Sequence, residues 1–552
     1  MADVAATNTT PAATDPKAAN KSKGHPEGPR DTTREIFETV VFVVVLVLML
    51  KLFVAEAFVI PTGSMAPTLY GDQVICTCRE CGHKFPINAM ENNQRVVVQH
   101  YICENCAYSS RDGEARDDVS SVSSGDRVLV SKYEYHLRDP RRFDVPVFKY
   151  PVEPYYAKEM QGMNYIKRLV GLGGETLAVF NGDLYTTRGL TYDWIPADER
   201  PKDEKDAWQF RYMYTKDMVA KEFFHQGKFD IVRKTPNEIL AMRRIVFDLD
   251  RQPKSRQSVR RVRWHPAPHE ENGWQMEEAG FKHTGDAPGW VRYQHIDPWD
   301  DGVIAPYYIA DFIGYNTRDN SRPFVRDPRE HWVSDLILDC TVEVPSQDSE
   351  VVLELAKGHD RFQATFVGGK CNLARITVAD TGHEERKEMG SHETKITKGG
   401  TYKLRLANVD ARLTVWVDNK ALAFGRDQTD FSPPNPTKRL EPFDKNDLQQ
   451  PARVGAKGEV KVSKVSLWRD LHYTCAWDRP TRKEKLFEPE PADFASCDDV
   501  QTFYIHPGHY LMFGDNSNSS ADSRSWGQVP HRLMLGRAVM VYWPMSRMGV
   551  IE

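Results

Sequence analysis

Hydrophobic residues form one long continuous stretch near the N-terminus of the chain. The run from Ile36 to Ile60 has an extended apolar body that Lys51 and Glu56 interrupt. A bilayer crossing needs about 20 apolar residues, so the pattern predicts one transmembrane helix over residues 35–60. Two alternatives stay open. One is a cleaved signal peptide, because Ala55-Glu56-Ala57 mimics a cleavage site, and the other is a buried core helix.

The segment before this stretch has a different composition. Residues 1–34 are rich in Ala, Thr, Pro, Lys and Asp and show no apolar period, which predicts a disordered tail. Its lysines and arginines place the tail in the cytoplasm by the positive-inside rule, with the rest of the chain exported. The pattern therefore predicts a single-pass protein of the cytoplasmic (inner) membrane, with membrane lipid as a partner and an extracytoplasmic main part.

Short apolar runs after the predicted helix favour strands. Arg127–Val130, Val145–Phe148 and Tyr165–Leu172 are bounded by Gly, Pro and Asp, as strands usually are. The segment from Tyr510 to Val550 has the same character. These runs predict a mainly β core that long insertions interrupt.

The longest insertion carries its own strand pattern. Tyr402, Leu404 and Leu406 alternate with charged residues, and residues 413–417 alternate again before a predicted hairpin turn at Asp418-Asn419. Several such strands at short spacing predict a β-sandwich of the jelly-roll kind over residues 331–475. Residues 186–330 receive no fold assignment beyond one short helix within Pro236 to Leu249.

Composition limits the classes of function. The chain has 552 residues, enough for two to four domains, and a net charge of −5. Acidic and basic residues nearly balance, so no basic surface indicates nucleic acid as a partner. Nine cysteines are too few for a disulfide scaffold in a chain of this length.

Five of the cysteines lie between Cys76 and Cys106, and four of them form two C-x-x-C pairs. The pairs Cys78-x-x-Cys81 and Cys103-x-x-Cys106 have the spacing of a four-thiolate zinc ribbon, which predicts structural zinc in an insertion over residues 76–112. Four thiolates leave the metal no open position, so no catalytic role is expected. The alternative is two disulfides or none, and export to an oxidising compartment strengthens it.

Three further segments carry candidate catalytic groups. Ser64 lies in Pro61-Thr62-Gly63-Ser64-Met65-Ala66-Pro67, where Gly and Pro constrain the backbone around the hydroxyl. Lys167 lies in an otherwise apolar strand, where burial would lower its pKa and let a neutral amine accept the serine proton. Residues 514–524 form a polar loop that we expect to orient the lysine. Each segment alone is a weak signal, since a turn serine and a solvent-exposed strand lysine are common.

Taken together, PTGSMAPTL, GDRVLVSKYEY, YIKRLVGLGGE and GDNSNSSADSRSWGQVP occur in this order after one apolar helix. This series resembles bacterial signal peptidase I, a membrane-bound serine endopeptidase with a Ser–Lys dyad. The matched boxes and the helix cover roughly a third of the chain, and the insertions lie outside the resemblance. The combination of a zinc ribbon and a jelly roll resembles the enlarged enzymes of planctomycete-type bacteria.

The resemblance implies a role for individual residues. Ser64 aligns with the nucleophile, Lys167 with the general base, and Thr62 with the hydroxyl that completes the oxyanion hole. Ser520 aligns with the residue that hydrogen-bonds the lysine amine. Two supporting ion pairs are implied, Arg168 with Asp515 and Asp522 with Arg524. The positions that line the substrate pocket, which would admit side chains the size of alanine, are Phe58, Ile60, Met65, Leu69, Tyr165 and Ile166.

The predicted organisation follows from these assignments. The peptidase core comprises residues 61–75, 120–185 and 500–552, and its substrates are exported preproteins cut after Ala-x-Ala, with no cofactor for catalysis. The sandwich is expected to bind a glycan or a protein, or to be a spacer without a ligand. Two other functions compete: a membrane-anchored receptor on an inactive peptidase fold, and a self-cleaving repressor of the LexA type, which would need a DNA-binding domain in place of the apolar helix.

Overall fold

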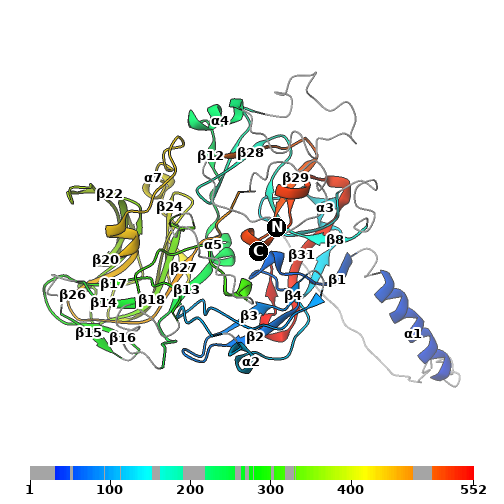
Figure 1. Cartoon of the computed structure of the whole chain (residues 1–552), viewed down its shortest axis with the longest axis horizontal. Coiled ribbons are helices and arrows are strands. Elements are labelled where there is room, and N and C mark those ends of the chain that lie inside the picture. The colour runs from blue at the N-terminus through cyan, green and yellow to red at the C-terminus, as the bar shows by residue number, and fades with distance from the viewer. Residues whose placement is uncertain are drawn as a thin grey trace, which may run out of the picture. The chain divides into compact units, whose positions relative to one another are not determined.

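The computed structural model confirms a mainly β fold (Figure 1). The chain divides into two compact units, residues 1–54 and 55–552, which we treat separately. The residues that the structure describes are 32–49, 54–91, 94–111, 113–151, 162–190, 218–254, 263–267, 273–277, 279–299, 304–317, 329, 331–475 and 500–552.

The described part of the first unit, residues 32–49 and 54, contains one helix. Helix α1 (Thr32–Met49) has an apolar body whose side chains are exposed, among them Phe37 and Phe42. None of the helices in the described part of the chain combines the length and apolar character that a membrane crossing requires. The predicted tail lies outside the described residues except for 32–34, which begin the helix.

The prediction of one helix over residues 35–60 is wrong at its C-terminal end. Ala55–Val59 forms strand β1 of the second unit and pairs antiparallel with strand β6 (Arg127–Ser131). The Glu56 carboxylate lies 3.3 Å from the Lys132 amine. Pairing with a neighbouring strand satisfies the backbone of this apolar segment in an extended form, and local composition does not reveal that partner.

The first sheet of the second unit carries the edge strand β1. Its strand order is β1-β6-β31-β7-β8, with β32 beside β31. The bounds of its other strands are β7 (Pro146–Lys149), β8 (Asn164–Ile166), β31 (Met534–Trp543) and β32 (Gly549–Val550).

Two smaller sheets complete this β core and join distant parts of the chain. Their orders are β12-β11-β10-β28 and β30-β29-β9, and Arg168 is paired with Phe513 in the second. The strand expected over Tyr165–Leu172 is in fact two strands in different sheets, β8 and β9, with Lys167 between them. The bounds are β9 (Arg168–Gly171), β10 (Thr176–Phe180), β11 (Asp183–Thr187), β12 (Asp230–Ile231), β28 (Gln501–Tyr504), β29 (His509–Phe513) and β30 (Val529–Pro530).

The cysteine-rich insertion forms a small β unit with its own core. Strand β2 pairs with β3, and β4 with β5. The four clustered cysteines pack with buried Phe85, Tyr101 and Trp299. Trp299 belongs to the segment without a fold assignment and donates a hydrogen bond from its indole N–H to the Cys106 carbonyl at 2.7 Å. The bounds are β2 (Gln73–Thr77), β3 (Lys84–Asn88), β4 (Met90–Glu91) and β5 (Gln94–Arg95).

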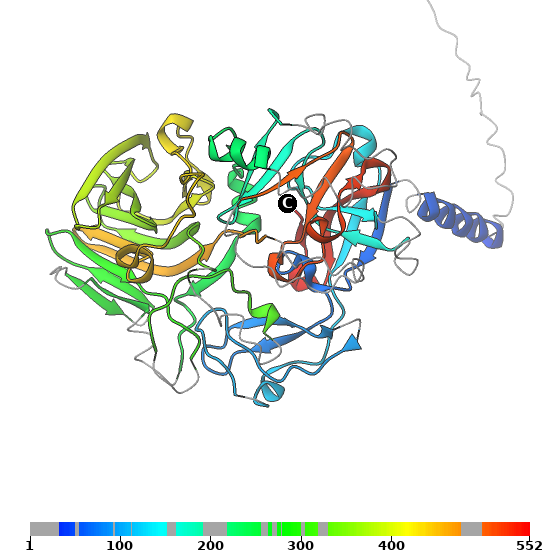
Figure 2. The same ribbon diagram turned by 45° about the horizontal axis from the view of Figure 1, so that its top comes forward.

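A sandwich of two antiparallel sheets occupies most of residues 244–469 (Figure 2). One sheet has the order β15-β16-β27-β18-β23-β24-β25 with β13 beside β27, and the other β14-β17-β26-β19-β20-β21-β22. Strands before residue 331 therefore complete both sheets. The bounds are β13 (Arg244–Asp248), β14 (Trp264–Pro266), β15 (Trp274–Glu277), β16 (Gly280–His283), β17 (Gly289–Tyr293), β18 (Leu336–Val344), β19 (Glu350–Lys357), β20 (Asp360–Val367), β21 (Lys370–Val378), β22 (Glu384–Glu393), β23 (Gly400–Val409), β24 (Arg412–Val417), β25 (Lys420–Ala421), β26 (Ala452–Lys457) and β27 (Val460–Arg469).

The turn expected at Asp418-Asn419 is present, and both residues have positive φ, 50° and 62°. Such a pair is typical of a two-residue hairpin turn. The alternation of strand β23 also holds for its apolar residues, since Leu404 and Leu406 are buried. Arg405 is the exception. It is buried as well, because its guanidinium pairs with Asp339 on the neighbouring strand.

The helix expected within Pro236 to Leu249 is shorter than that range. Helix α5 (Pro236–Met242) begins with a capping box between Thr235 and Glu238 and ends before strand β13. The β-branched residues that follow pair with β27 instead of extending the helix. The remaining short helices are α2 (Ala115–Asp118), α3 (Glu134–Leu137), α4 (Met218–His225), α7 (Arg426–Thr429) and α8 (Ser523–Trp526).

Candidate active site

Ser64 lies in a single 3₁₀ turn, Gly63–Met65, that follows strand β1. A Cβ atom at Gly63 would lie 2.1 Å from the Tyr315 ring, so only glycine fits there. Asn516 holds the turn from the other side. Its backbone N–H donates to the Ser64 carbonyl at 3.1 Å, and its side-chain amide donates to the Gly63 carbonyl at 3.1 Å. The serine hydroxyl is thus presented by a fixed backbone.

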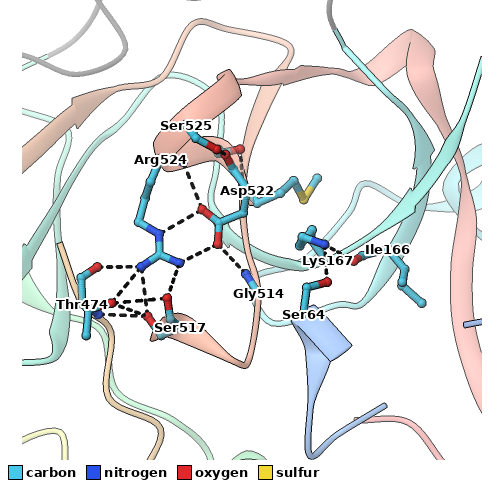
Figure 3. Close-up of polar contacts among 11 residues, drawn as sticks. Ser64, Ile166, Lys167, Thr474, Gly514, Ser517, Asp522, Arg524 and Ser525 are labelled. Atoms are coloured by element: carbon cyan, nitrogen blue, oxygen red, sulfur yellow. Dashed lines mark hydrogen bonds and ion pairs between the residues drawn. The ribbon is translucent and has the colours of Figure 1, made fainter. Parts of the chain in front are cut away.

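The Lys167 amine meets the Ser64 hydroxyl directly (Figure 3). Its Nζ donates to Ser64 Oγ at 2.7 Å and to the Ile166 carbonyl at 3.1 Å. The lysine is 3% exposed. Loss of hydration on burial lowers the pKa of Lys167 to about 8, although the Asp522 and Asp515 carboxylates act in the opposite direction. A substantial neutral fraction near neutral pH makes this amine competent as a general base.

The residue after the lysine anchors it to the polar loop. Arg168 and Asp515 form a fully buried bidentate ion pair, with N–O distances of 2.8 and 2.7 Å. Arg168 also donates to the carbonyls of Phe143 and Glu552. The Arg168 guanidinium holds the pKa of Asp515 below its ordinary value despite burial. Asp515 also accepts a hydrogen bond from the Thr68 hydroxyl at 2.5 Å.

The second expected ion pair closes the same loop (Figure 3). Arg524 donates to both Asp522 oxygens, at 2.9 and 2.6 Å, and neither side chain is exposed. Asp522 also accepts from the Gly514 N–H at 2.9 Å, and Arg524 donates to the Thr474 carbonyl at 2.8 Å. Both carboxylates near Lys167 are therefore already neutralised by arginines.

Two residues assigned by resemblance are close to the dyad without a bond to it. Ser520 is fully buried, and its Oγ has no hydrogen-bond partner among the described residues. A Cβ atom at Gly514 would lie 2.1 Å from that Oγ and 2.4 Å from the Ser64 carbonyl, which places Ser520 beside the turn that carries Ser64. Thr62 precedes the turn and is exposed. Its hydroxyl does not cap the 3₁₀ turn by a hydrogen bond.

The expected pocket residues share an apolar cluster next to Ser64. Ile60, Met65, Leu69 and Ile166 are buried in it, and Phe58 packs against it. Met65 and Leu69 are completely buried, so they support the surface from below rather than forming it. Phe58 and Tyr165 are half-buried, so their side chains are the ones of this set that are partly accessible to a substrate. Tyr165 packs in the neighbouring cluster with Trp526.

Sequence reasoning missed three residues of the insertions that contact the Ser64 turn or the polar loop of residues 514–524. The Asn316 amide exchanges hydrogen bonds with Asn516 at 2.8 and 2.9 Å, and Tyr315 packs beside Gly63. Arg244 lies 3.8 Å from Asp515. All three belong to residues 186–330, where no motif signals them, because their role depends on a contact across more than a hundred residues.

The four predicted metal ligands converge at one point. The sulfur atoms of Cys78, Cys81, Cys103 and Cys106 lie within 4.8 Å of one another, with 3.7 Å between Cys78 and Cys106 and 3.6 Å between Cys81 and Cys103. A tetrahedral zinc site with Zn–S bonds of about 2.3 Å separates its sulfurs by about 3.7–3.8 Å. The thiols are free, and a disulfide needs an S–S distance of about 2.05 Å, so the geometry fits a metal.

The other cysteines differ among themselves. Cys340 and Cys371 are free and buried in the sandwich, and Cys76 is free and buried beside the four clustered cysteines. Cys475 is disulfide-bonded. Cys497 lies outside the described residues.

Comparison with known proteins relates part of the chain, including Lys167 but not Ser64, to one protein family. The profile of the family described as "Signal peptidase, peptidase S26" matches residues 108–228 and 455–543, less than half of the chain. Signal peptidase I of Leptolyngbya laminosa is 50% identical over 40 residues, 7% of this chain and 20% of that protein. Probable signal peptidase I-2 of Synechocystis sp. is 28% identical over 169 residues, 31% of this chain and 51% of that protein.

These matches support a relationship to the signal peptidase I family. The chain spans about half or less of the length of these curated relatives. Among solved structures, the carbohydrate-binding module CBM66 from Bacillus subtilis covers 37% of this chain and 94% of its own length at 8% identity, with a TM-score of 0.23. A score this low supports no inference about a ligand.

The buried ion pair behind the lysine yields a stability prediction. Asp515→Ala leaves the Arg168 charge buried and uncompensated, so we expect the free energy of unfolding to fall by about 3–5 kcal/mol at pH 7 in urea titrations. Glu388→Ala removes the exposed partner of Arg386 and should cost under about 1 kcal/mol. Equal losses for both variants would contradict the assignment.

Proposed function

We propose that this chain is a serine endopeptidase that removes signal peptides from exported preproteins after small residues. Ser64 is the nucleophile and Lys167 the general base. The observation that carries the proposal is the 2.7 Å contact between a buried lysine amine and the Ser64 hydroxyl. The family match over residues 108–228 and 455–543 supports the class of substrate.

The proposed reaction has two halves, formation of an acyl-enzyme and its hydrolysis, and Lys167 acts as the base in both. Ser64 Oγ attacks the carbonyl carbon of the scissile peptide and transfers its proton to the neutral Lys167 amine. The oxyanion receives hydrogen bonds from the Ser64 N–H and the Thr62 hydroxyl. Collapse breaks the C–N bond, and Lys167 returns the proton to the leaving amine. Water, deprotonated by the same lysine, then hydrolyses the acyl-enzyme and releases Ser64.

Selectivity for Ala-x-Ala is part of the proposal. Its support is the apolar wall around the nucleophile, built from Phe58, Tyr165 and the buried cluster below them. A shallow apolar surface accepts a methyl group and excludes larger side chains by steric contact. Ser520 is buried beside Gly514 with a hydroxyl that has no partner among the described residues, and it takes the role of orienting the lysine.

Association with a membrane completes the proposed setting. The exposed apolar side chains of α1 (Thr32–Met49) support contact with lipid, with the catalytic unit on the extracytoplasmic side. Preproteins tethered in the same membrane would then reach Ser64 at high effective concentration. A glycan or protein ligand of the sandwich, and a planctomycete-type origin, stay predictions.

Cleavage assays test the catalytic assignment. The full chain in detergent should cut a preprotein with an Ala-x-Ala site, and Ser64→Ala and Lys167→Met should each lower kcat/KM by at least about a thousandfold, since dyad members act as a unit. Lys149→Met is the matched control, because this strand lysine is outside the dyad and should leave the rate near wild type. A folded wild type that does not cut would favour the receptor hypothesis.

The pH profile tests the lysine as base. Lys167 must be neutral to accept the proton, and its pKa lies at about 8. We therefore expect kcat/KM to rise with pH up to about 8 and to fall about tenfold for each unit below it. The profile is measured between pH 5 and 9, and the folded fraction is checked at each pH, because proteins tend to be most stable between about pH 5 and 8. A rate independent of pH below 7 would exclude this base.

Zinc in the four-thiolate site is proposed as a structural metal. Purified wild type should hold about one zinc per chain by elemental analysis, and Cys81→Ser should lose it together with several degrees of Tm. Cys371→Ser, a free buried thiol of the sandwich, is the matched control and should keep the metal. Metal-free wild type with the Tm of Cys81→Ser would rule the site out.

A further inference from the structure

A hollow lies beside the segment that follows Ser64, and neither Ser64 nor Lys167 is among the residues that line it. It has a volume of about 540 Å³, and its walls come from three parts of the second unit. Thr68 and Tyr70 line it from the β core, and Glu104 lines it from the cysteine-rich insertion. Arg244 and Trp468 line it from the sandwich. Ligand pockets typically measure about 300–1,000 Å³, so the space suits a small molecule rather than single waters.

Arg244 is buried in this wall without a carboxylate of its own. Its side chain is 4% exposed, and its Nε has no hydrogen-bond partner. The nearest carboxylate, Asp515 at 3.8 Å, already holds Arg168 in a bidentate pair. Its Nη2 donates to the Thr68 hydroxyl at 3.4 Å, and its Nη1 donates to the Arg243 carbonyl at 3.2 Å. The guanidinium is therefore under-compensated in a place where uncompensated charge is costly.

Arg243, the preceding residue, repeats this arrangement on the sandwich side. It lies 3.4 Å from Asp339, and Asp339 already forms a bidentate pair with Arg405. The Arg243 guanidinium lies over the Trp468 ring at 4.2 Å and is partly exposed to the hollow. Asp515 is therefore shared by Arg168 and Arg244, and Asp339 is shared by Arg405 and Arg243. Burial lowers the pKa of both Arg243 and Arg244.

The other carboxylates of the hollow make no ion pair with Arg243 or Arg244 among the described residues. The Asp248 carboxylate is paired with Arg251 at 3.2 Å, and Glu104 shares a hydrogen bond with His83 at 3.1 Å. Asp250 is the remaining carboxylate, and exposed Lys464 on the same wall acts on it electrostatically. Neither Arg243 nor Arg244 has a partner among these groups within the described residues.

From this imbalance we propose that the hollow is a binding site for a small anion, a carboxylate or a phosphate, held by Arg243 and Arg244 with Lys464 at the rim. A planar guanidinium binds either anion through two parallel N–H···O bonds, which would satisfy the Arg244 Nε. The site is separate from the Ser64–Lys167 dyad. The Thr68 hydroxyl connects this wall to the polar loop of residues 514–524, because it hydrogen-bonds both Arg244 and Asp515.

Calorimetric titration of the full chain tests the site. Inorganic phosphate and succinate are titrated separately at constant ionic strength set with chloride, and at least one should bind saturably. Arg243→Gln and Lys464→Ala should each weaken that binding about tenfold, the loss expected for one charge-assisted contact. Lys461→Ala is the matched control, because this exposed lysine of the same strand pairs with Glu277 and does not line the hollow.

The outcomes separate cleanly. Stronger binding of phosphate identifies a phosphate ligand, and stronger binding of succinate identifies a carboxylate ligand. Saturable binding of neither anion would overturn the proposal. So would equal affinity in wild type, Arg243→Gln and Lys464→Ala. Lys464 is exposed, so its variant should fold normally and keeps the test decisive even if the Arg243 variant is unstable.

Discussion

Desolvation of one amine is the constraint on which the candidate active site depends. Lys167 is a useful base only if its charged form is disfavoured, yet two carboxylates, Asp522 and Asp515, act on it in the opposite sense. The structure resolves this conflict by giving each carboxylate a bidentate arginine partner, Arg524 and Arg168. With both charges neutralised at short range, burial remains the largest influence on the lysine.

The same ion pairs also give the site its rigidity. Arg168 joins the strand after the lysine to the loop that follows β29 and to the C-terminal carbonyl of Glu552. Asn516 of that loop fixes the Ser64 turn. The nucleophile, the base and their supports therefore come from chain segments separated by more than a hundred residues, and none of them is positioned by its own strand or turn alone.

The insertions take part in this arrangement instead of being independent attachments. Tyr315 and Asn316 brace the turn that carries Ser64. A second buried network ties the sandwich to its connections, since the Lys234 amine bonds Asp410 at 2.8 Å and Asp470 at 2.7 Å. Buried charges of this kind tolerate only a complete set of partners, so they restrict how the sandwich can join the β core.

The residue pattern alone identified several strands of the core and of the sandwich, together with the four cysteines of the candidate metal site. Alternation located β23 and β24, the positive-φ turn at Asp418-Asn419 joined β24 to β25 as expected, and the C-x-x-C pairs marked four sulfurs that meet in space. Ser64 and Lys167 were identified by resemblance, and they are in contact. These features are local, or are written in short motifs, which is why they can be recognised without a structure.

Tertiary structure decided what depends on distant partners. Ala55–Val59 is a strand because β6 offers its backbone a pairing partner, although its composition continues an apolar helix. Strands before residue 331 complete the sandwich because β27 and β26 accept them. Arg244 and Asn316 matter through contacts across the fold. Local pattern reports the preference of a segment, whereas pairing, burial and charge compensation are properties of the neighbours that folding brings to it.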